Sequence, residues 1–493
     1  MPYPRPPHHY MHPSTPTWRA AVAIAVVLAF AGASLASAQE IGGTSSEPPS
    51  GLTGPALSRA IQQSLAADPA QSSQTAQASG PDKRWGHAVL GTIGVNVVFN
   101  LVNLAFRPDA REEFKVTPKT WWDNLKYGMI FDDNNFSTNQ FGHPYQGNLY
   151  FNVGRANGLN YWESGLMSAL GSFTWECCGE TNRMSINDFF STTLGGMVVG
   201  EVTHRMASLA RNPKQGQAGL GGKIASIVLD PMGAVVNRKA NDNPPAVMPD
   251  YLGANVRLGA VWRGAAGTLD EAKAYPEFEF DFQYGNPFDE DAREPFDSFN
   301  GWLRLGGGGG ISELILRGRL VGRHVKDSQA TAIRFEVNQG FEYISNPAYE
   351  FGAQAVYVTF PLRRKLSETT NVTFTSGGFI LPLGAISAEY VDVNERSYDY
   401  GPGGGAVVAL RLNRAGLPIL SAAYAVFAIN TVNGSGGSHA AQLATIEGNA
   451  PISRKLGAGV SFRYFQRNSF YVTQPDTFTR YPEARVYMIW RLE

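Results

Sequence analysis

The C-terminal half of the chain alternates between apolar and polar positions with a period of two. From about residue 252 onward, segments of roughly ten residues show this alternation, with turn residues between them. In the segment 456–467, for example, Val460 and Phe462 share one face, whereas Arg463 lies on the other. About twelve such segments, an even number, predict a transmembrane β-barrel with an apolar outer face and a mixed inner face.

A water-soluble exported β-sandwich or barrel would show the same alternation. Aromatic residues near the ends of the expected strands favour the membrane barrel, because such residues form girdles at the two interfaces. They are Tyr357, Phe360, Tyr390, Tyr400, Tyr471 and Tyr481. We therefore expect a mixed fold class: a C-terminal antiparallel transmembrane β-barrel of about 12 strands with an N-terminal α-helical domain, preceded by a signal peptide and a flexible linker.

A long apolar segment before the strands predicts a helix over 85–106. It contains no proline, and its amides Asn96, Asn100 and Asn103 are four and three residues apart, so they share one helical face. The segment could span an inner membrane, but three amides in a span are unfavourable. We expect instead that the amides form hydrogen bonds with later helices.

Two further helices are predicted within 161–205. In the first, Ser164, Ser168, Ser172 and Glu176 recur every four residues and form a narrow ridge that permits close helix contact. Before the second, Ser185 is a good N-cap, and Asp188 follows three residues later as in a capping box. Gly196 and Gly200 in this helix form a small-xxx-small contact face.

The N-terminus has the pattern of a secretory signal. Arg5 and Arg19 precede an apolar run over 20–35, and the small residues 36–38 form a cleavage site. An uncleaved anchor is the alternative, although the run is shorter than the ~20 residues of a membrane span. We expect export to the bacterial outer membrane. The expected division is 1–38 signal peptide, 39–82 disordered linker, 83–245 helical domain and 246–493 β-barrel.

Charge and cysteine content exclude some classes of protein. The signal contains two of the 41 basic residues and none of the 42 acidic ones, so the mature chain is weakly acidic and we expect no nucleic-acid partner. Cys177 and Cys178 are adjacent, and a bridge between neighbours closes a strained ring. Two small buried thiols are therefore expected, with a redox or metal role as the alternative.

The candidates for chemistry lie between residues 143 and 205. An enzyme hypothesis takes His143 as base, Glu176 or Glu201 as its partner, and Arg155 or Arg205 as anion stabiliser, acting on a lipid or cell-wall ester. Glu201 and His204 have the Glu-x-x-His spacing of bundle metal sites, but no second pair accompanies them. The chain has no G-x-S-x-G elbow and no phosphate-binding loop, so no cofactor is expected. Because His143 precedes a proline, we place it in an extended or turn segment.

The competing hypothesis is structural, and we favour it because no nucleophile and base stand out as a pair. In it, Arg155 and Arg205 pair with Glu163, Glu176, Glu180 or Glu201, and the helical unit plugs or caps the barrel. Asn187 and Asp188 belong to the same polar network. Transport is a third reading, although about twelve strands lie near the lower limit for an open channel. The expected partners are the outer-membrane bilayer and an envelope lipid or small solute.

An ordered series of motifs resembles a bacterial family known as domain of unknown function 3943. The motifs are GHPYQGNLYF at 142–151, the turn at 155–158, WES at 162–164, GSFTWE at 171–176, SIND at 185–188, TTLGGMVVGE at 192–201 and DPMG at 230–233. The resemblance covers about a quarter of the chain, roughly residues 120–240. It implies an envelope protein without an established activity, and so it supplies no reaction.

Overall fold

The computed structural model describes residues 82–211, 219–236, 249, 251–265, 268–288, 294–306, 310–391 and 396–492. The expected signal peptide and nearly all of the expected linker lie outside these residues. So does the expected boundary between residues 245 and 246. These expectations therefore stay predictions.

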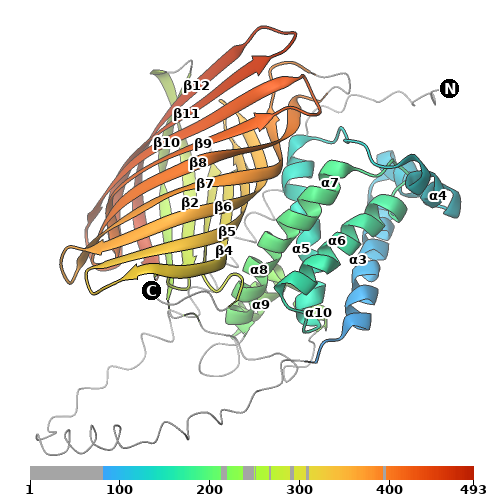
Figure 1. Ribbon diagram of the computed structural model, residues 1–493, viewed down its shortest axis with the longest axis horizontal. Helices are drawn as coiled ribbons and strands as arrows, with labels where there is room; N and C mark the ends of the chain where they lie inside the picture. The colour runs from blue at the N-terminus through green and yellow to red at the C-terminus, as the bar shows by residue number, and fades with distance from the viewer. Residues whose placement is uncertain are drawn as a thin grey trace, which may run out of the picture.

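Within the described residues, twelve antiparallel strands form one closed barrel (Figure 1). Each strand pairs with its neighbours in the chain, and β1 pairs with β12 to close the barrel. The strands are β1 (Leu252–Ala265), β2 (Thr268–Tyr284), β3 (Phe299–Gly306), β4 (Ile311–Asp327), β5 (Thr331–Ser345), β6 (Glu350–Lys365), β7 (Thr370–Ser387), β8 (Tyr398–Arg414), β9 (Leu417–Asn430), β10 (Gly437–Pro451), β11 (Leu456–Tyr471) and β12 (Thr477–Leu492). The predicted barrel and its strand number are confirmed.

Alternate residues of each strand point outward and inward. On β11, Val460 is 58% exposed on the outside, whereas Arg463 is buried inside. The predicted aromatic girdle is mostly wrong: Phe360 is exposed, but Tyr357 and Tyr400 are almost completely buried. Tyr357 bonds to a carboxylate of the interior, and Tyr400 accepts a hydrogen bond from a helical segment. Position near a strand end did not reveal which face an aromatic occupies.

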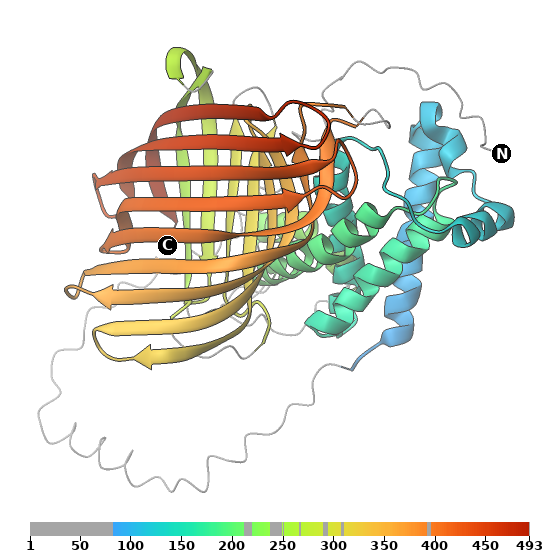
Figure 2. The same cartoon turned by 45° about the horizontal axis from the view of Figure 1, so that its top comes forward.

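The helices lie beside the barrel, against its outer wall (Figure 2). They are α3 (Trp85–Phe106), η2 (Pro108–Phe114), α4 (Pro118–Tyr127), η3 (Thr138–Gly142), α5 (His143–Ala156), α6 (Tyr161–Cys178), α7 (Ile186–Phe190), η4 (Ser191–Gly195), α8 (Gly196–Arg211), α9 (Leu220–Leu229) and α10 (Pro231–Val236). One hydrophobic core joins helical residues such as Phe151 and Val202 to Phe280, Phe282 and Phe341 of the strands. The expected plug or cap is therefore wrong, because the helices cover part of the wall from outside.

The barrel residues under the helices occupy outward positions. On β2, Phe280 and Phe282 alternate with Glu279 and Asp281, whose carboxylates bind arginines of the interior. On the neighbouring wall, the Tyr161 hydroxyl donates to Gln339 Oε1 at 2.6 Å. Sequence alternation cannot distinguish such a covered outer face from a lipid-facing one, because both require apolar side chains.

Small residues let the helices approach closely, as the sequence predicts. A Cβ atom on Gly196 would lie 2.6 Å from the Cα of Gly147, and one on Gly200 would lie 2.6 Å from a ring carbon of Phe151. The serine ridge of α6 faces α5, where the Ser168 hydroxyl donates to the Gly147 carbonyl at 3.1 Å. Larger residues at these glycines would force α5 and α8 apart.

The amides of α3 bond mostly to other segments. Asn96 Nδ2 donates to the Gly171 carbonyl of α6 at 3.0 Å, and its Oδ1 accepts from the Tyr150 hydroxyl of α5. Asn100 Nδ2 donates to the carbonyls of Phe114 and Gly179, whereas Asn103 bonds within its own helix. Two of the three amides thus fix α3 to its neighbours.

Three local expectations need correction. His143 begins α5 rather than lying in a turn, because proline in the first helical turn lacks only an N–H that has no helical partner. Ser185 caps α7 as predicted, but Glu176 rather than Asp188 accepts from its backbone N–H. Cys177 and Cys178 form a disulfide, so the expectation of two free thiols is wrong.

Candidate functional site

An apolar cavity lies between the helices and the outer wall of the barrel. Its volume is about 50 Å³, and about 660 Å³ when all space between the lining atoms and the solvent at its open mouth is counted. Residues of the η3–α5 region, α8 and α9 form one side, and residues of β2 to β5 form the other. The lining residues are Phe141, Pro144, Tyr145, Val199, Thr203, Val228, Leu229, Phe280, Phe282, Trp302, Leu303, Leu314, Leu316 and Phe341. Nearly all of them are apolar, which suits a hydrocarbon ligand rather than a polar one.

A buried polar cluster adjoins this cavity through the start of α5. His143 directly precedes two lining residues, and its Nε2 lies 3.4 Å from Asp188 Oδ1. Asn187 Nδ2 donates both to Asp188 Oδ1 at 2.9 Å and to Asp132 Oδ1 at 2.6 Å. Asn139 also donates to Asp132 Oδ1 at 2.6 Å. The cluster ties η3, α5 and α7 together at one end of the helical domain.

Burial controls the protonation of this cluster. Burial lowers the pKa of the His143 imidazole, and the negative charge of Asp132 offsets only part of this decrease. Burial, together with the Asp132 carboxylate, raises the pKa of Asp188 well above its usual value. It also raises the pKa of Glu180, in the turn after α6, to about 8. Burial therefore shifts the pKa values of His143 and Asp188 in the directions that favour their neutral forms.

Glu201 lies at the centre of a second buried group. Its Oε1 is 2.7 Å from Arg205 Nε, and its Oε2 is 3.0 Å from Arg155 Nε. Arg205 also binds Glu294 at 2.8 Å and the Pro295 carbonyl at 3.0 Å, both in the connection between β2 and β3. This group therefore joins α5 to α8 and both helices to the barrel. The pairing of both arginines with Glu201, as the structural hypothesis predicts, is present.

The other candidate residues of the enzyme, structural and metal hypotheses do not converge. Glu176 accepts from the Ser185 N–H, and Glu201 binds the two arginines, so His143 has Asp188 as its partner instead of either glutamate. Glu163 lies at the surface, where it binds Lys83 at 2.7 Å rather than Arg155. His204 Nδ1 lies 3.2 Å from Asp230 Oδ2, so Asp230 rather than Glu201 is its ion-pair partner. No cluster of metal-binding side chains occurs among the described residues.

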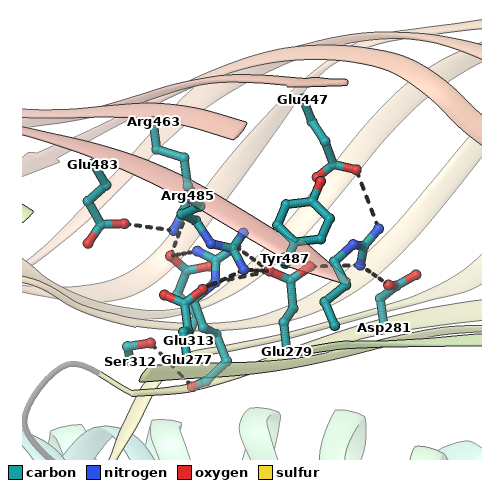
Figure 3. A network of polar contacts seen from close by, with 12 residues as sticks. Glu277, Glu279, Asp281, Ser312, Glu313, Glu447, Arg463, Glu483, Arg485 and Tyr487 are labelled. Carbon is teal, nitrogen blue, oxygen red and sulfur yellow. Dashed lines mark hydrogen bonds and ion pairs between the residues drawn. The ribbon is translucent and has the colours of Figure 1, made fainter. Parts of the chain in front are cut away.

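Charged side chains fill part of the barrel interior (Figure 3). Arg304 binds Glu279 at 2.7 Å and Glu313 at 3.0 Å, and Arg485 binds Glu279 at 2.7 Å. Arg463 of β11 also binds Glu313 of β4, although β12, β1, β2 and β3 lie between these strands in the barrel order. The network thus crosses the interior instead of following one wall.

Aromatic side chains fill another part of the interior. The ring centroid of Phe427 on β9 lies 4.5 Å from that of Phe351 on β6 and 5.2 Å from that of Phe379 on β7. Tyr349, in the turn before β6, donates to the Gln442 carbonyl of β10 at 3.3 Å and contacts Phe465. The interior is therefore crossed by an apolar cluster as well as by ion pairs.

Three interior residues are linked like a catalytic triad but with the two imidazole nitrogens exchanged, because the serine of a triad binds Nε2 and its aspartate binds Nδ1. Ser469 Oγ lies 2.9 Å from His439 Nδ1, and His439 Nε2 lies 2.9 Å from Asp399 Oδ2. None of the three is more than 1% exposed, and none lines the cavity described above. Asp399 also accepts from Thr431 Oγ1 at 3.0 Å and from the Ser435 N–H at 2.8 Å. We interpret the triad as a lock between β8, β10 and β11, because no substrate reaches the serine.

Sequence reasoning missed Asp132, the triad and the interior network. The triad residues are separated by 40 and 30 positions, so no motif joins them. The network did have a signal: Glu277, Glu279 and Asp281 recur at every second position of one predicted strand. Three acids on the inner face of a barrel strand require basic partners on the facing strands.

Comparison with known proteins supports the resemblance found in the sequence. A family model described as Domain of unknown function (DUF3943) matches residues 128–232, which include α5 to α9 and the His143 and Glu201 groups. No curated protein is significantly similar to the chain.

Solved structures of outer-membrane porins and channels are similar to the barrel part of the chain. The NanC porin is 8% identical, with 48% of this chain and 98% of that chain covered and a TM-score of 0.27. The outer membrane channel DcaP of Acinetobacter baumannii is 10% identical, with 49% and 96% covered and a TM-score of 0.22. The anion-selective porin from Comamonas acidovorans is 5% identical, with 49% and 98% covered and a TM-score of 0.21. These scores are too low to carry an argument about activity.

Proposed function

We propose that the protein is an integral outer-membrane protein that binds a lipid hydrocarbon chain between its helices and its barrel. The barrel serves as anchor and wall, and the binding surface lies on its outside. The observation that carries the proposal is the apolar cavity against an outward-facing barrel surface. Its lining is almost entirely apolar, as a site for a hydrocarbon chain requires.

The bilayer setting is supported by the uncovered part of the barrel wall. Outward aliphatic side chains there are strongly exposed, such as Ile380 at 62%, Ile446 at 58% and Val460 at 58%. Exposed apolar residues in a band around a barrel are stable in lipid but unfavourable in water. The cavity lies against the same outer surface of the barrel, so acyl chains of the membrane are the apolar ligands at hand.

An open channel is the less favoured function because contacts cross the interior. Passage of a solute requires separation of Arg463 from Glu313 and of Tyr349 from β10. Breaking one buried charged pair costs about 3–5 kcal/mol, so a resting open state is unfavourable. Transport then depends on an opening event that the resting barrel opposes.

The test is a lipid analysis of protein purified in mild detergent. Native mass spectrometry of the wild type should show bound lipid. Val199→Phe fills the cavity and should reduce the bound lipid several-fold, whereas Val408→Phe, on the uncovered wall, should not. Equal lipid content in both variants, or none in the wild type, would contradict the proposal.

Hydrolysis of a lipid ester is a second candidate, favoured by the position of His143 beside the cavity. The neutral imidazole is the form that can accept a proton from water, and Asp188 Oδ1 lies 3.4 Å from its Nε2. Cleavage of a fluorogenic fatty-acid ester should then fall at least about a hundredfold in His143→Gln. If the wild type binds lipid but does not cleave the ester, the binding role stands and the hydrolase hypothesis is contradicted.

A further inference from the structure

The face of the helical domain that points away from the barrel is formed by α3 and α6 and is apolar. On α3, the exposed side chains are Leu90, Ile93, Val97, Val98, Leu101, Val102 and Phe106. On α6, they are Trp162, Leu166 and Phe173. The buried positions of α3 are instead the small or polar Ala88, Thr92 and Asn96. This helix is therefore apolar on its outside and polar toward its own domain, the reverse of a helix at a water surface.

The length of α3 matches a bilayer. Its 22 residues, at about 1.5 Å each, extend about 33 Å, against a hydrocarbon thickness of about 30 Å. The segment has no Asp, Glu, Lys or Arg, whereas Lys83 and Arg84 precede it and Arg107 follows it. Charges therefore flank the apolar segment at both ends, as in membrane-spanning helices.

Tryptophans mark both ends of this face. Lys83 beside α3 binds Glu163 at the start of α6, and Asn100 of α3 reaches Gly179 after the end of α6, so the two helices run in parallel. Exposed Trp85 and Trp162 thus lie at one end, near their N-termini. At the other end, Trp121 of α4 is exposed and donates to the Cys178 carbonyl at 3.0 Å.

Exposed Trp122 of α4 extends this second aromatic end. Tryptophan is enriched at both membrane interfaces because its ring is apolar and its N–H needs a polar partner. Two aromatic ends separated by a continuous aliphatic surface are not needed in a protein domain that faces water.

We infer that the α3–α6 face is embedded in the same bilayer as the barrel and contacts acyl chains directly. The helical domain is then a lateral, membrane-level extension of the barrel, with α3 as its lipid-facing helix. The inference rests on the proposed bilayer setting and deepens it, because it names a helical lipid contact in addition to the strands. Asn96 and Asn100 bond to α6, α5, η2 and the Gly179 carbonyl, and Asn103 bonds to the Phe99 carbonyl of its own helix, so each amide of this row has a hydrogen-bond partner.

The test uses spin labels on single introduced cysteines in the full-length protein in lipid vesicles. The labelled sites are Val98→Cys on the α3 face, Ile380→Cys on the barrel wall and Asp109→Cys just beyond α3. The wild type, whose two cysteines are bonded to each other, gives the blank. The label's accessibility to oxygen, relative to a water-soluble nickel complex, should be several-fold higher at Val98 and Ile380 than at Asp109.

The outcomes separate the two proposals. Lipid exposure at Ile380 with water exposure at Val98 would overturn the inference and leave the barrel in the membrane. Water exposure at both sites would refute the proposed bilayer setting as well. Leu101→Cys, on the same face, replaces Val98→Cys if that variant fails to fold, and it must give the same result.

Discussion

Replacement of Glu201 by Gln should strongly destabilise the helical domain. The change keeps the shape of the side chain but removes the negative charge that Arg155 and Arg205 share at 3.0 and 2.7 Å. Glu201 is completely buried, so water cannot replace the carboxylate. Breaking a buried pair costs about 3–5 kcal/mol. Because Arg205 keeps Glu294 as a partner, we expect the free energy of unfolding to fall by an amount near the lower end of this range.

The assay is urea unfolding in detergent, followed by the helical circular-dichroism signal. With a slope of about 1–3 kcal/mol/M, the midpoint should fall by at least about 1 M. Glu163→Gln is the matched control: it makes the same substitution in the same domain, but its partner Lys83 is half exposed. Such surface pairs contribute about 0–1 kcal/mol, so this midpoint should hardly move. Equal midpoints for the two variants would refute the reasoning, and a stable but inactive Glu201→Gln would support a catalytic role.

Three further predictions concern other parts of the molecule. Glu313→Gln weakens the cross-barrel contact with Arg463 and should raise single-channel conductance in planar bilayers; unchanged conductance would mean that the contact does not seal the interior. Gly196→Ala should lower the urea midpoint because its Cβ would overlap α5, whereas Gly94→Ala meets no atom within 4 Å and should not. The pKa of the Glu180 carboxyl is 4.5 in the unfolded chain and about 8 in the folded one, so the free energy of unfolding should fall as the pH rises from 4.5 to 8. Urea titrations at about pH 5 and about pH 8 should show a smaller difference for Glu180→Gln than for the wild type.

The features that could be read from the sequence are those set by local geometry. Strand alternation places Val460 outside and Arg463 inside whatever the strand's partner is. The helix 85–106 has the predicted bounds, because Arg107 and Pro108 end the apolar pattern. The close contact at Gly196 was predictable for the same reason, since small residues four apart share one helical face.

The partners of individual charges could not be read in this way. Glu163 and Glu201 are both glutamates within a helical segment, yet one binds a surface lysine and the other two buried arginines. The choice depends on which helix face meets α5, and side-chain spacing alone does not fix this. His143 was matched with the wrong carboxylates for the same reason, because α7 brings Asp188 to it from 45 residues away.

The amide row of α3 also bears on how such a helix reaches the outer membrane. An apolar helix of this length without polar residues would be held in the inner membrane during export. Asn96, Asn100 and Asn103 make an isolated span less favourable while the chain is unfolded. After folding, Asn96 and Asn100 bond to α6, α5 and the carbonyls beside them, so these amides do not oppose the proposed contact of α3 with lipid. Substitution of Asn96 and Asn100 by leucine should therefore divert the protein to the inner membrane, which fractionation would detect.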